Sequence, residues 1–248
     1  MKIIRVKNSI PALLIALSII IGTIIVANAY RYKFRSTETI SVTGLAEKDF
    51  TSDQIVWTGN FSRTGYDLKS VYANLKSDEA QIKQYQNSKG IQDSNMIFSS
   101  LDIQKLFEPK IDANGKTVGS IFNGYTLTGK VTVDSKNIDG IEKLSREITD
   151  LLQKGIEFSS SAPKYYYTRL NDLKIDLLAK AAADGRLRAE TIANNSHAQL
   201  GGIKKATMGI FQITGKNSNE DYSYGGALNT SSREKTASIT LRVDYEVQ

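Results

Sequence analysis

The chain has 248 residues, with 32 Lys and Arg against 26 Asp and Glu and a formal charge of +6. All six surplus cations lie in the first 35 residues, so residues 36–248 carry no net charge and lack the basic surface that nucleic-acid binding requires. The absence of Cys excludes disulfides and thiolate chemistry, and the single histidine, His197, excludes a two-His metal site within one subunit.

Residues 10–29 predict a membrane segment. This run of twenty residues carries no charge and follows a tail with three basic residues. As a helix it would be ~30 Å long, which matches the core of a bilayer. It is longer than the ~7–15 apolar residues of a signal peptide, which favours an uncleaved anchor. The sequence Ala27-Asn28-Ala29 leaves cleavage near Ala29 as the alternative. The three cations before this run are balanced by Arg31, Lys33 and Arg35 after it, and with the amino-terminal amine added we expect the short tail inside and the main domain outside.

We divide the chain at residue 36. Residues 1–35 are predicted to comprise a cytoplasmic tail, the anchor and a basic juxtamembrane segment, and residues 36–248 one main domain. Within this domain, residues 39–46 and 54–64 alternate apolar and polar side chains, as strands do. Asp67 is then placed to cap a helix that ends at Gly90.

The rest of the chain continues the alternation of hairpins and helices. Residues 95–106 and 121–133 predict an antiparallel hairpin around the turn sequence at 112–115. The later predicted elements are a helix at 138–153, short strands at 156–161 and 164–168, a helix at 171–197, and strands at 203–214 and 234–247.

In the long helix, Ile175, Gly185 and the small residues at helical spacing between and after them are expected to form one buried stripe, with close packing as the compensation for Gly185. Gly201-Gly202 is expected to end the helix. The order of elements predicts an α+β fold with antiparallel hairpins and about three helices, mainly on one face of a sheet.

Several segments resemble the SIMPL domain family. Residues 40–44 (Ile-Ser-Val-Thr-Gly), followed by Ala46-Glu47, resemble the family's opening strand, and residues 90–95 resemble its passage from first helix to central hairpin. Similar segments follow in order at Asn123-Gly124-Tyr125, in the Ala-rich stretch 179–193, and at Leu200-Gly201-Gly202-Ile203. The chain departs from the family pattern at residues 48–50, where Pro is common, and at residues 165–167.

The resemblance implies a bacterial envelope protein. The family includes periplasmic immunogenic antigens, has associations with stress tolerance, and contains members that form ring-like homo-oligomers. It implies an α/β domain beside a projecting antiparallel hairpin sheet, and no catalytic residues. Together with the anchor, it places this chain in the bacterial inner membrane through residues 10–29, with the main domain in the periplasm. Cleavage near Ala29 would instead give a periplasmic or outer-membrane-associated protein.

Four motifs that could carry chemistry are better explained by structure. Residues 124–130 have the spacing of a phosphate loop, but Val131 replaces the hydroxyl residue and the alternation predicts a strand. The Ser232–Lys235 spacing precedes a strand without its partner motifs. His197 lies near a helix end, and Asp172 and Asp176 lie among lysines on a solvated face. We therefore assign no catalytic residue, no metal ligand and no cofactor.

Three tyrosines are the candidate partner-binding residues. Tyr222 and Tyr224 lie in a loop at 215–229, and Tyr166 lies in the predicted strand at 164–168. Tyrosine offers broad hydrogen-bonding area at low rotamer entropy. A mobile hairpin tip and core packing are the competing interpretations of the loop and of Tyr166.

The leading functional hypothesis is a membrane-anchored envelope protein that acts, without turnover, by self-association or by binding other envelope components. One alternative is an envelope hydrolase with an unidentified carboxylate or serine site. Another is a peptide or glycan binding module that uses the Tyr222 loop. The expected partners are thus the membrane, a second copy of the chain, and an envelope protein or glycan.

Overall fold

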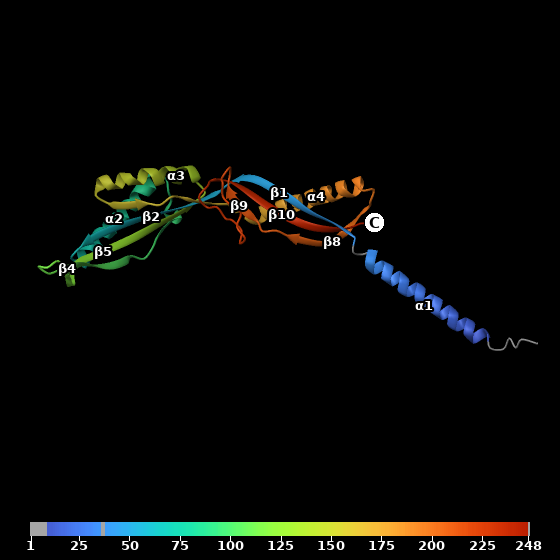
Figure 1. Ribbon diagram of the computed structural model, residues 1–248. Coiled ribbons are helices and arrows are strands. Elements are labelled where there is room, and N and C mark those ends of the chain that lie inside the picture. The colour runs from blue at the N-terminus through green and yellow to red at the C-terminus, as the bar shows by residue number, and fades with distance from the viewer. Residues whose placement is uncertain (1–8, 36–37, 248) are drawn as a thin grey trace, which may run out of the picture. The chain divides into compact units, whose positions relative to one another are not determined.

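The computed structural model describes residues 9–35 and 38–247. Its first element is a 27-residue helix, α1 (Ser9–Arg35), in which residues Pro11–Tyr32 are apolar enough and long enough to cross a membrane. The hydroxyls of Ser18 and Thr23 donate to carbonyls one turn earlier, at 2.8 Å each, so these polar groups need no outside partner. The predicted apolar helix is confirmed, and it continues beyond residue 29 (Figure 1).

The chain divides into two compact units. The first combines residues up to Glu47 with Lys174–Phe211 and Ser238 onwards, and the second combines Lys48–Leu173 with Gln212–Ala237. Each unit is therefore built from segments that are far apart in the sequence.

A helix packed on a sheet forms the first unit. The sheet has the order β1 (Thr39–Thr51), β10 (Glu234–Val247), β8 (Leu200–Met208). β9 (Gln212–Gly215) pairs with β10 as well, and it belongs, like the first residues of β10, to the second unit. β10 and β8 are antiparallel. In the part of β10 from residue 239 to 245 alternate residues are buried, and one of them, Val243, lies next to Gly185 of α4 (Leu170–Asn195). The buried face of α4 is formed by Leu173, Leu177, Ala181, Gly185, Ala189 and Ala193.

The closest approach of α4 to the sheet is at Gly44. A Cβ atom at Gly44 would lie 2.0 Å from the carbonyl oxygen of Ala181, whereas a Cβ atom at Gly185 would lie 3.5 Å from the nearest atom, the amide nitrogen of Gly44. The helix does approach the sheet closely at Gly185, but a side chain there would meet only ordinary contacts, so the steric requirement for glycine falls on Gly44 of β1.

Two expectations about α4 are wrong. Ile175, which the helical spacing placed on the buried stripe, is 70% exposed. The helix ends at Asn195, before His197 adopts a φ of 54°, and Gly201 and Gly202 lie inside β8 instead of ending the helix. Because the residues around position 180 are small, more than one face of the helix could be buried. Contact with the sheet determines which face is buried in the structure.

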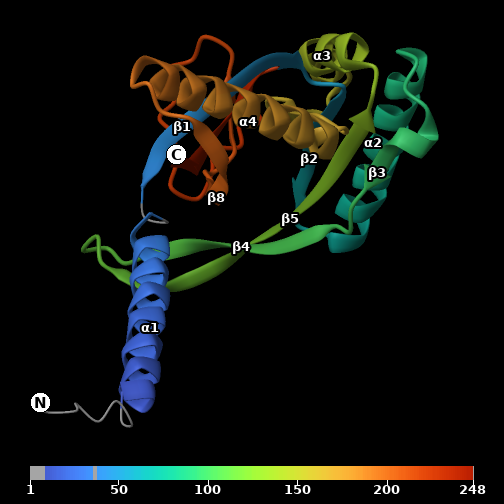
Figure 2. The ribbon, with the colours of Figure 1, turned by 90° about the vertical axis from the view of Figure 1, so that its right-hand side faces the viewer.

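A six-stranded antiparallel sheet forms the second unit. Its order is β3 (Met96–Phe98), β5 (Thr117–Ser135), β2 (Gln54–Gly65), β6 (Glu157–Ser160), with β4 (Asp102–Ile111) also paired to β5 and β7 (Lys164–Tyr166) to β2. Figure 2 shows β4 and β5 as one long hairpin. The predicted strand at 95–106 is thus two strands, and β4 and β5 are longer towards the turn than predicted.

Three helical segments enclose the core of this unit. They are α2 (Leu68–Ser88), α3 (Ile138–Glu147) and a 3₁₀ segment, η3 (Ile148–Lys154). Trp57 and Phe61 of β2, together with Leu75 of α2 and Ile141 of α3, are almost completely buried in one cluster. A short 3₁₀ turn, η2 (Asp93–Asn95), precedes β3.

The predicted ends of α2 are confirmed. The Asp67 carboxylate accepts the Ser70 N–H at 2.8 Å, and Gly90 follows the helix with a φ of 85°. The α+β fold class with an apolar amino-terminal helix and antiparallel sheets is also confirmed. The three helices that follow α1 pack on two different sheets. α2 and α3 pack on the sheet of the second unit, and α4 packs on the sheet of the first.

Candidate interaction surface

The β4–β5 hairpin extends beyond the rest of its sheet. Residues 125–135 of β5 pair with β2, whereas residues 117–124 pair only with β4. We call residues 107–122 the distal ribbon; in it Phe107 is opposite Phe122 and Ile111 is opposite Thr117. A two-stranded ribbon is marginal by itself in water. This segment therefore leaves two strand edges open to a partner.

Apolar side chains on the distal ribbon face solvent. The exposed members are Phe107, Ile111, Val118, Ile121 and Phe122. The rings of Phe107 and Phe122 make an edge contact, with centroids 6.0 Å apart. Phe122 makes a second such contact with Tyr125 at 5.0 Å. Contiguous apolar groups on the surface of a soluble domain are typical of an interaction site.

Local contacts fix the base of the ribbon. Asn123 lies at a register shift, between residues paired with Leu106 and Phe107. Its side chain accepts from the Tyr66 hydroxyl at 2.5 Å and donates to the Glu108 carboxylate. Gly124 has a φ of 110°, and a Cβ atom there would lie 2.8 Å from the carbonyl oxygen of Gly65. A bulge of this kind bends a strand and increases its twist.

The tip of the ribbon is also held. The Asp112 carboxylate accepts the N–H groups of Asn114 and Lys116 at 2.9 Å each, and Gly115 has a φ of 78°. The sequence predicts strands only up to residue 106 and from residue 121, whereas β4 continues to Ile111 and β5 begins at Thr117, next to the predicted turn. The apolar residues on both sides of the turn, from Phe107 to Ile121, were the signal for longer strands.

The loop between β9 and β10 carries two of the three candidate tyrosines. Tyr222 is exposed and Tyr224 is 99% exposed. The buried side chain of Gln212 donates to the Ser223 carbonyl at 2.9 Å and accepts the Ala227 N–H at 2.6 Å. These hydrogen bonds tie both sides of the tyrosine segment to β9.

A second set of contacts closes the same loop. The Glu220 carboxylate accepts the Gly215 N–H at 3.0 Å and the side-chain amide of Asn229, and these bonds lower the pKa of Glu220. Lys235 is 2% exposed, and its ammonium donates to the carbonyl and side-chain oxygens of Asn229. Burial lowers the pKa of Lys235 to about 8.

Tyr166 lies apart from that loop segment, on β7. It lines an open pocket of about 490 Å³ with polar residues of β2 and β5, including Asn60 and Lys130. It also borders a smaller pocket of about 80 Å³ that Lys235 lines as well. Neither space is lined by Tyr222 or Tyr224, so the three tyrosines do not share one of these sites.

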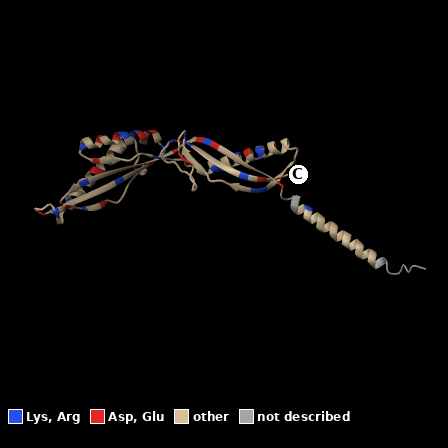
Figure 3. Ribbon diagram, viewed as in Figure 1, with Lys and Arg blue, Asp and Glu red and all other residues tan. Residues whose placement is uncertain are grey.

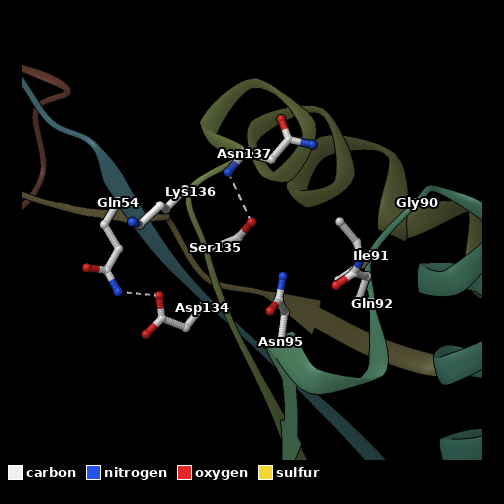
Figure 4. A pocket seen from close by; sticks show the side chains of 9 residues that line it. All are labelled: Gln54, Gly90, Ile91, Gln92, Asn95, Asp134, Ser135, Lys136 and Asn137. Atoms are coloured by element: carbon white, nitrogen blue, oxygen red, sulfur yellow. Dashed lines mark hydrogen bonds between the residues drawn. The ribbon is translucent and has the colours of Figure 1, made fainter.

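Another polar pocket of the second unit is lined by groups that hold the ends of helices and strands. It measures about 530 Å³, and Figure 4 shows its lining side chains from β2, β5 and the segment that follows α2. Gln54 donates to Asp134 at 2.5 Å, and the Asn137 N–H donates to the Ser135 hydroxyl at 3.0 Å. The Asn137 side chain caps α3. No nucleophile lining this pocket is hydrogen-bonded to a lining base.

The other motifs are explained by local structure. Residues 124–131 lie inside β5, and the Asp176 carboxylate pairs with Lys180 at 3.1 Å on exposed helix surface. Lys235 of the Ser232–Lys235 motif points to Asn229. Among residues 9–35 and 38–247, no cluster of three His, Cys, Asp or Glu side chains could hold a metal ion. Figure 3 shows acidic and basic residues interspersed along α4 and along the sheet beside it.

A protein-family model described as SIMPL, protein of unknown function (DUF541), matches residues 40–247. The match covers the strands and helices of both units and leaves α1 outside. No curated protein sequence matches the chain. The matched span is more than half of the sequence.

Proposed function

The chain belongs to the SIMPL family, and on that premise we propose that it is a bacterial envelope protein, anchored in the inner membrane by α1, that acts by self-association and without turnover. The main domain, residues 36–248, lies in the periplasm in this proposal. The length of the apolar run of α1 supports an uncleaved anchor. The orientation rests on a narrow excess of positive charge before this run over Arg31, Lys33 and Arg35 after it.

The distal ribbon is the structural feature that supports self-association. Residues 117–124 of β5 have a partner on one side only, and the adjacent strand β4 is exposed along almost its whole length. Open strand edges promote pairing with another chain. Folded proteins ordinarily blunt such an edge or cover it, and a second copy of the chain would cover both the edge and the phenyl rings beside it.

The solution mass of the whole chain in detergent, measured by light scattering at several protein concentrations, tests the proposal. A closed assembly gives one high mass that does not change with dilution, because closed symmetry fixes the number of subunits. We expect Ile121→Lys to lower this mass. Ile97→Lys should leave it unchanged, because Ile97 is an equally exposed apolar residue of the same sheet that lies outside the ribbon.

A deletion gives an independent measurement. Removal of residues 103–122 should abolish assembly and leave a folded monomer, because the core of the second unit uses none of these residues. A monomeric wild-type chain at every concentration, or a deletion variant that keeps the full mass, would overturn the proposal.

Binding of an envelope peptide or glycan is the second candidate function, and the tyrosine loop favours it. Tyr224 presents its whole side chain from a segment held by Gln212, so binding would cost little loop ordering. A Tyr222→Ala, Tyr224→Ala variant should capture less of a peptidoglycan fragment while its solution mass stays unchanged. Equal capture by variant and wild type would remove this candidate.

A further inference from the structure

An open groove lies between α4 and β1 in the first unit. It measures about 650 Å³ and is lined by Val42 and Thr43 of β1 and by a stripe along the helix. The stripe consists of Asp184, Leu187, Arg188, Thr191 and Ile192. These positions recur at three- and four-residue intervals and therefore share one face of α4. Leu187 is 63% exposed although it is apolar.

The strand wall of the groove presents unpaired backbone. β1 is the outermost strand of its sheet, because the order is β1-β10-β8. The Leu45 N–H donates to the Asp184 carboxylate at 2.8 Å, so α4 supplies an acceptor where a neighbouring strand would otherwise lie. N–H groups two residues apart on a strand point to the same side. The backbone of Thr43 therefore points away from β10, into the groove.

A helix facing an open strand edge is a recurring site for strand addition. An extended segment pairs with the edge through its backbone, and its side chains enter the space under the helix. An added strand could pair with β1 only up to Leu45, because the Leu45 N–H already donates to Asp184. The free edge runs from Thr39 to Thr43, five residues, which suits a short strand.

The charged groups that line the groove favour an uncharged segment as its occupant. The only ionisable groups in the groove lining are Asp184 and Arg188, and they pair with each other at 2.8 Å. The Leu45 N–H, and after it Arg188, lower the pKa of Asp184, so the carboxylate stays ionised in this pair. A charged segment would find no counter-ion free, whereas an apolar segment could pack on Leu187 and Ile192.

The distal ribbon supplies a segment of this kind. Residues 117–122 (Thr-Val-Gly-Ser-Ile-Phe) carry no charge, and Val118 and Ile121 are exposed. Their backbone is open on the side away from β4. β4 is less suited to pairing along its own outer edge, because Pro109 has no N–H to donate.

We infer that residues 117–122 of one copy add as a strand to β1 of a second copy, in the groove under α4. This inference rests on the proposed self-association and names the two surfaces that make it. The contact is heterologous, since the ribbon and the groove are different surfaces. Repeating it from copy to copy generates a ring when the rotation closes and a filament when it does not.

Substitutions in the groove test the contact by its effect on mass. Leu187→Glu places a charge where the added strand would pack, and we expect the detergent-solubilised full-length chain to lose its high mass. Ile175→Glu is the matched control, because Ile175 lies on the same helix outside the groove and is 70% exposed. Thermal melting followed by circular dichroism shows whether each variant is folded. Mixing Leu187→Glu with Ile121→Lys chains should restore part of the assembly.

Cross-linking tests the contact directly, because the chain contains no Cys. Full-length Leu187→Cys chains are mixed with chains that carry one Cys at a position from 117 to 122, and are then oxidised. We expect disulfide-linked pairs of the two variants at one or two ribbon positions, since a disulfide requires Cα atoms within about 7 Å. Ile175→Cys chains should give none with the same partners.

Three results would separate the two proposals. An assembled wild type whose mass survives Leu187→Glu, or whose Leu187→Cys chains cross-link no better than Ile175→Cys chains, overturns the groove contact and leaves self-association standing. A wild type that never assembles overturns self-association itself. Cross-linked pairs together with loss of mass in Leu187→Glu establish the contact.

Discussion

Glycine at position 44 is a steric requirement, while glycine at 185 is not. Gly44→Ala would place a methyl group 2.0 Å from the Ala181 carbonyl oxygen, which is backbone and cannot rotate away. We expect this change to reduce the unfolding free energy by about 3 kcal/mol, the upper end of overpacking costs. Gly185→Ala meets only ordinary contacts at 3.5 Å and improves helix propensity by up to ~1 kcal/mol. Urea unfolding of the two variants should therefore give shifts of opposite sign, and equal losses would contradict this account.

Lys235 should make stability rise with pH in the alkaline range. Burial lowers its pKa in the folded chain to about 8, against an ordinary 10.5. Between these values the unfolded chain holds more protons than the folded chain, so the free energy of unfolding increases with pH. Below pH 8 both states are protonated, and the penalty of burying the ammonium is complete. The stability difference between wild type and Lys235→Met should grow in favour of wild type from pH 8 to 10.5.

The control for this titration is Lys143→Met, which replaces an exposed lysine of α3. Urea unfolding at four pH values gives both differences. A difference for Lys235→Met that stays flat with pH would show that the buried amine does not change its charge in this range.

An ion pair joins α2 to the sheet of the second unit. The Arg63 guanidinium donates to both oxygens of the buried Asp78 carboxylate, at 2.5 and 2.8 Å. Asp78→Leu should cost roughly 2 kcal/mol of unfolding free energy, because a hydrogen bond to a charged group contributes ~1.5–3 kcal/mol. Arg63→Met in the Asp78→Leu background should recover most of that loss, since both partners are then apolar. Additive losses in the double-mutant cycle would contradict a direct pair.

The helices and strands could be predicted from the sequence more fully than the tertiary contacts between them. Alternation identified β1 and β2, and Asp67 and Gly90 marked the ends of α2, because these signals are local. The position of Asp78 on the buried face of α2 has no local signal, since its partner Arg63 lies on a strand. The same is true of Gly44, whose role depends on a helix more than 130 residues later.

The candidate surface was predicted in part. The turn sequence at 112–115 predicted a hairpin, and the family resemblance implied that it projects. The groove between α4 and β1 was not predicted, because the small residues of the long helix allow several of its faces to be the buried one. Contact with Gly44 buries the face that contains Gly185 and leaves Leu187 exposed.

At the scale of the whole molecule, the fate of α1 decides how copies meet. An uncleaved anchor confines all copies to one surface, which raises their effective concentration and favours even a weak contact between ribbons and grooves. The Ala27-Asn28-Ala29 sequence lies within α1, which continues to Arg35, and its apolar span of 22 residues exceeds that of a signal peptide. We therefore expect the protein purified from membranes to retain residues 1–29, as measured by intact mass. A species that begins at Tyr30 and is found in the soluble periplasmic fraction would contradict the anchor, and assembly would then have to proceed in solution from ribbon and groove alone.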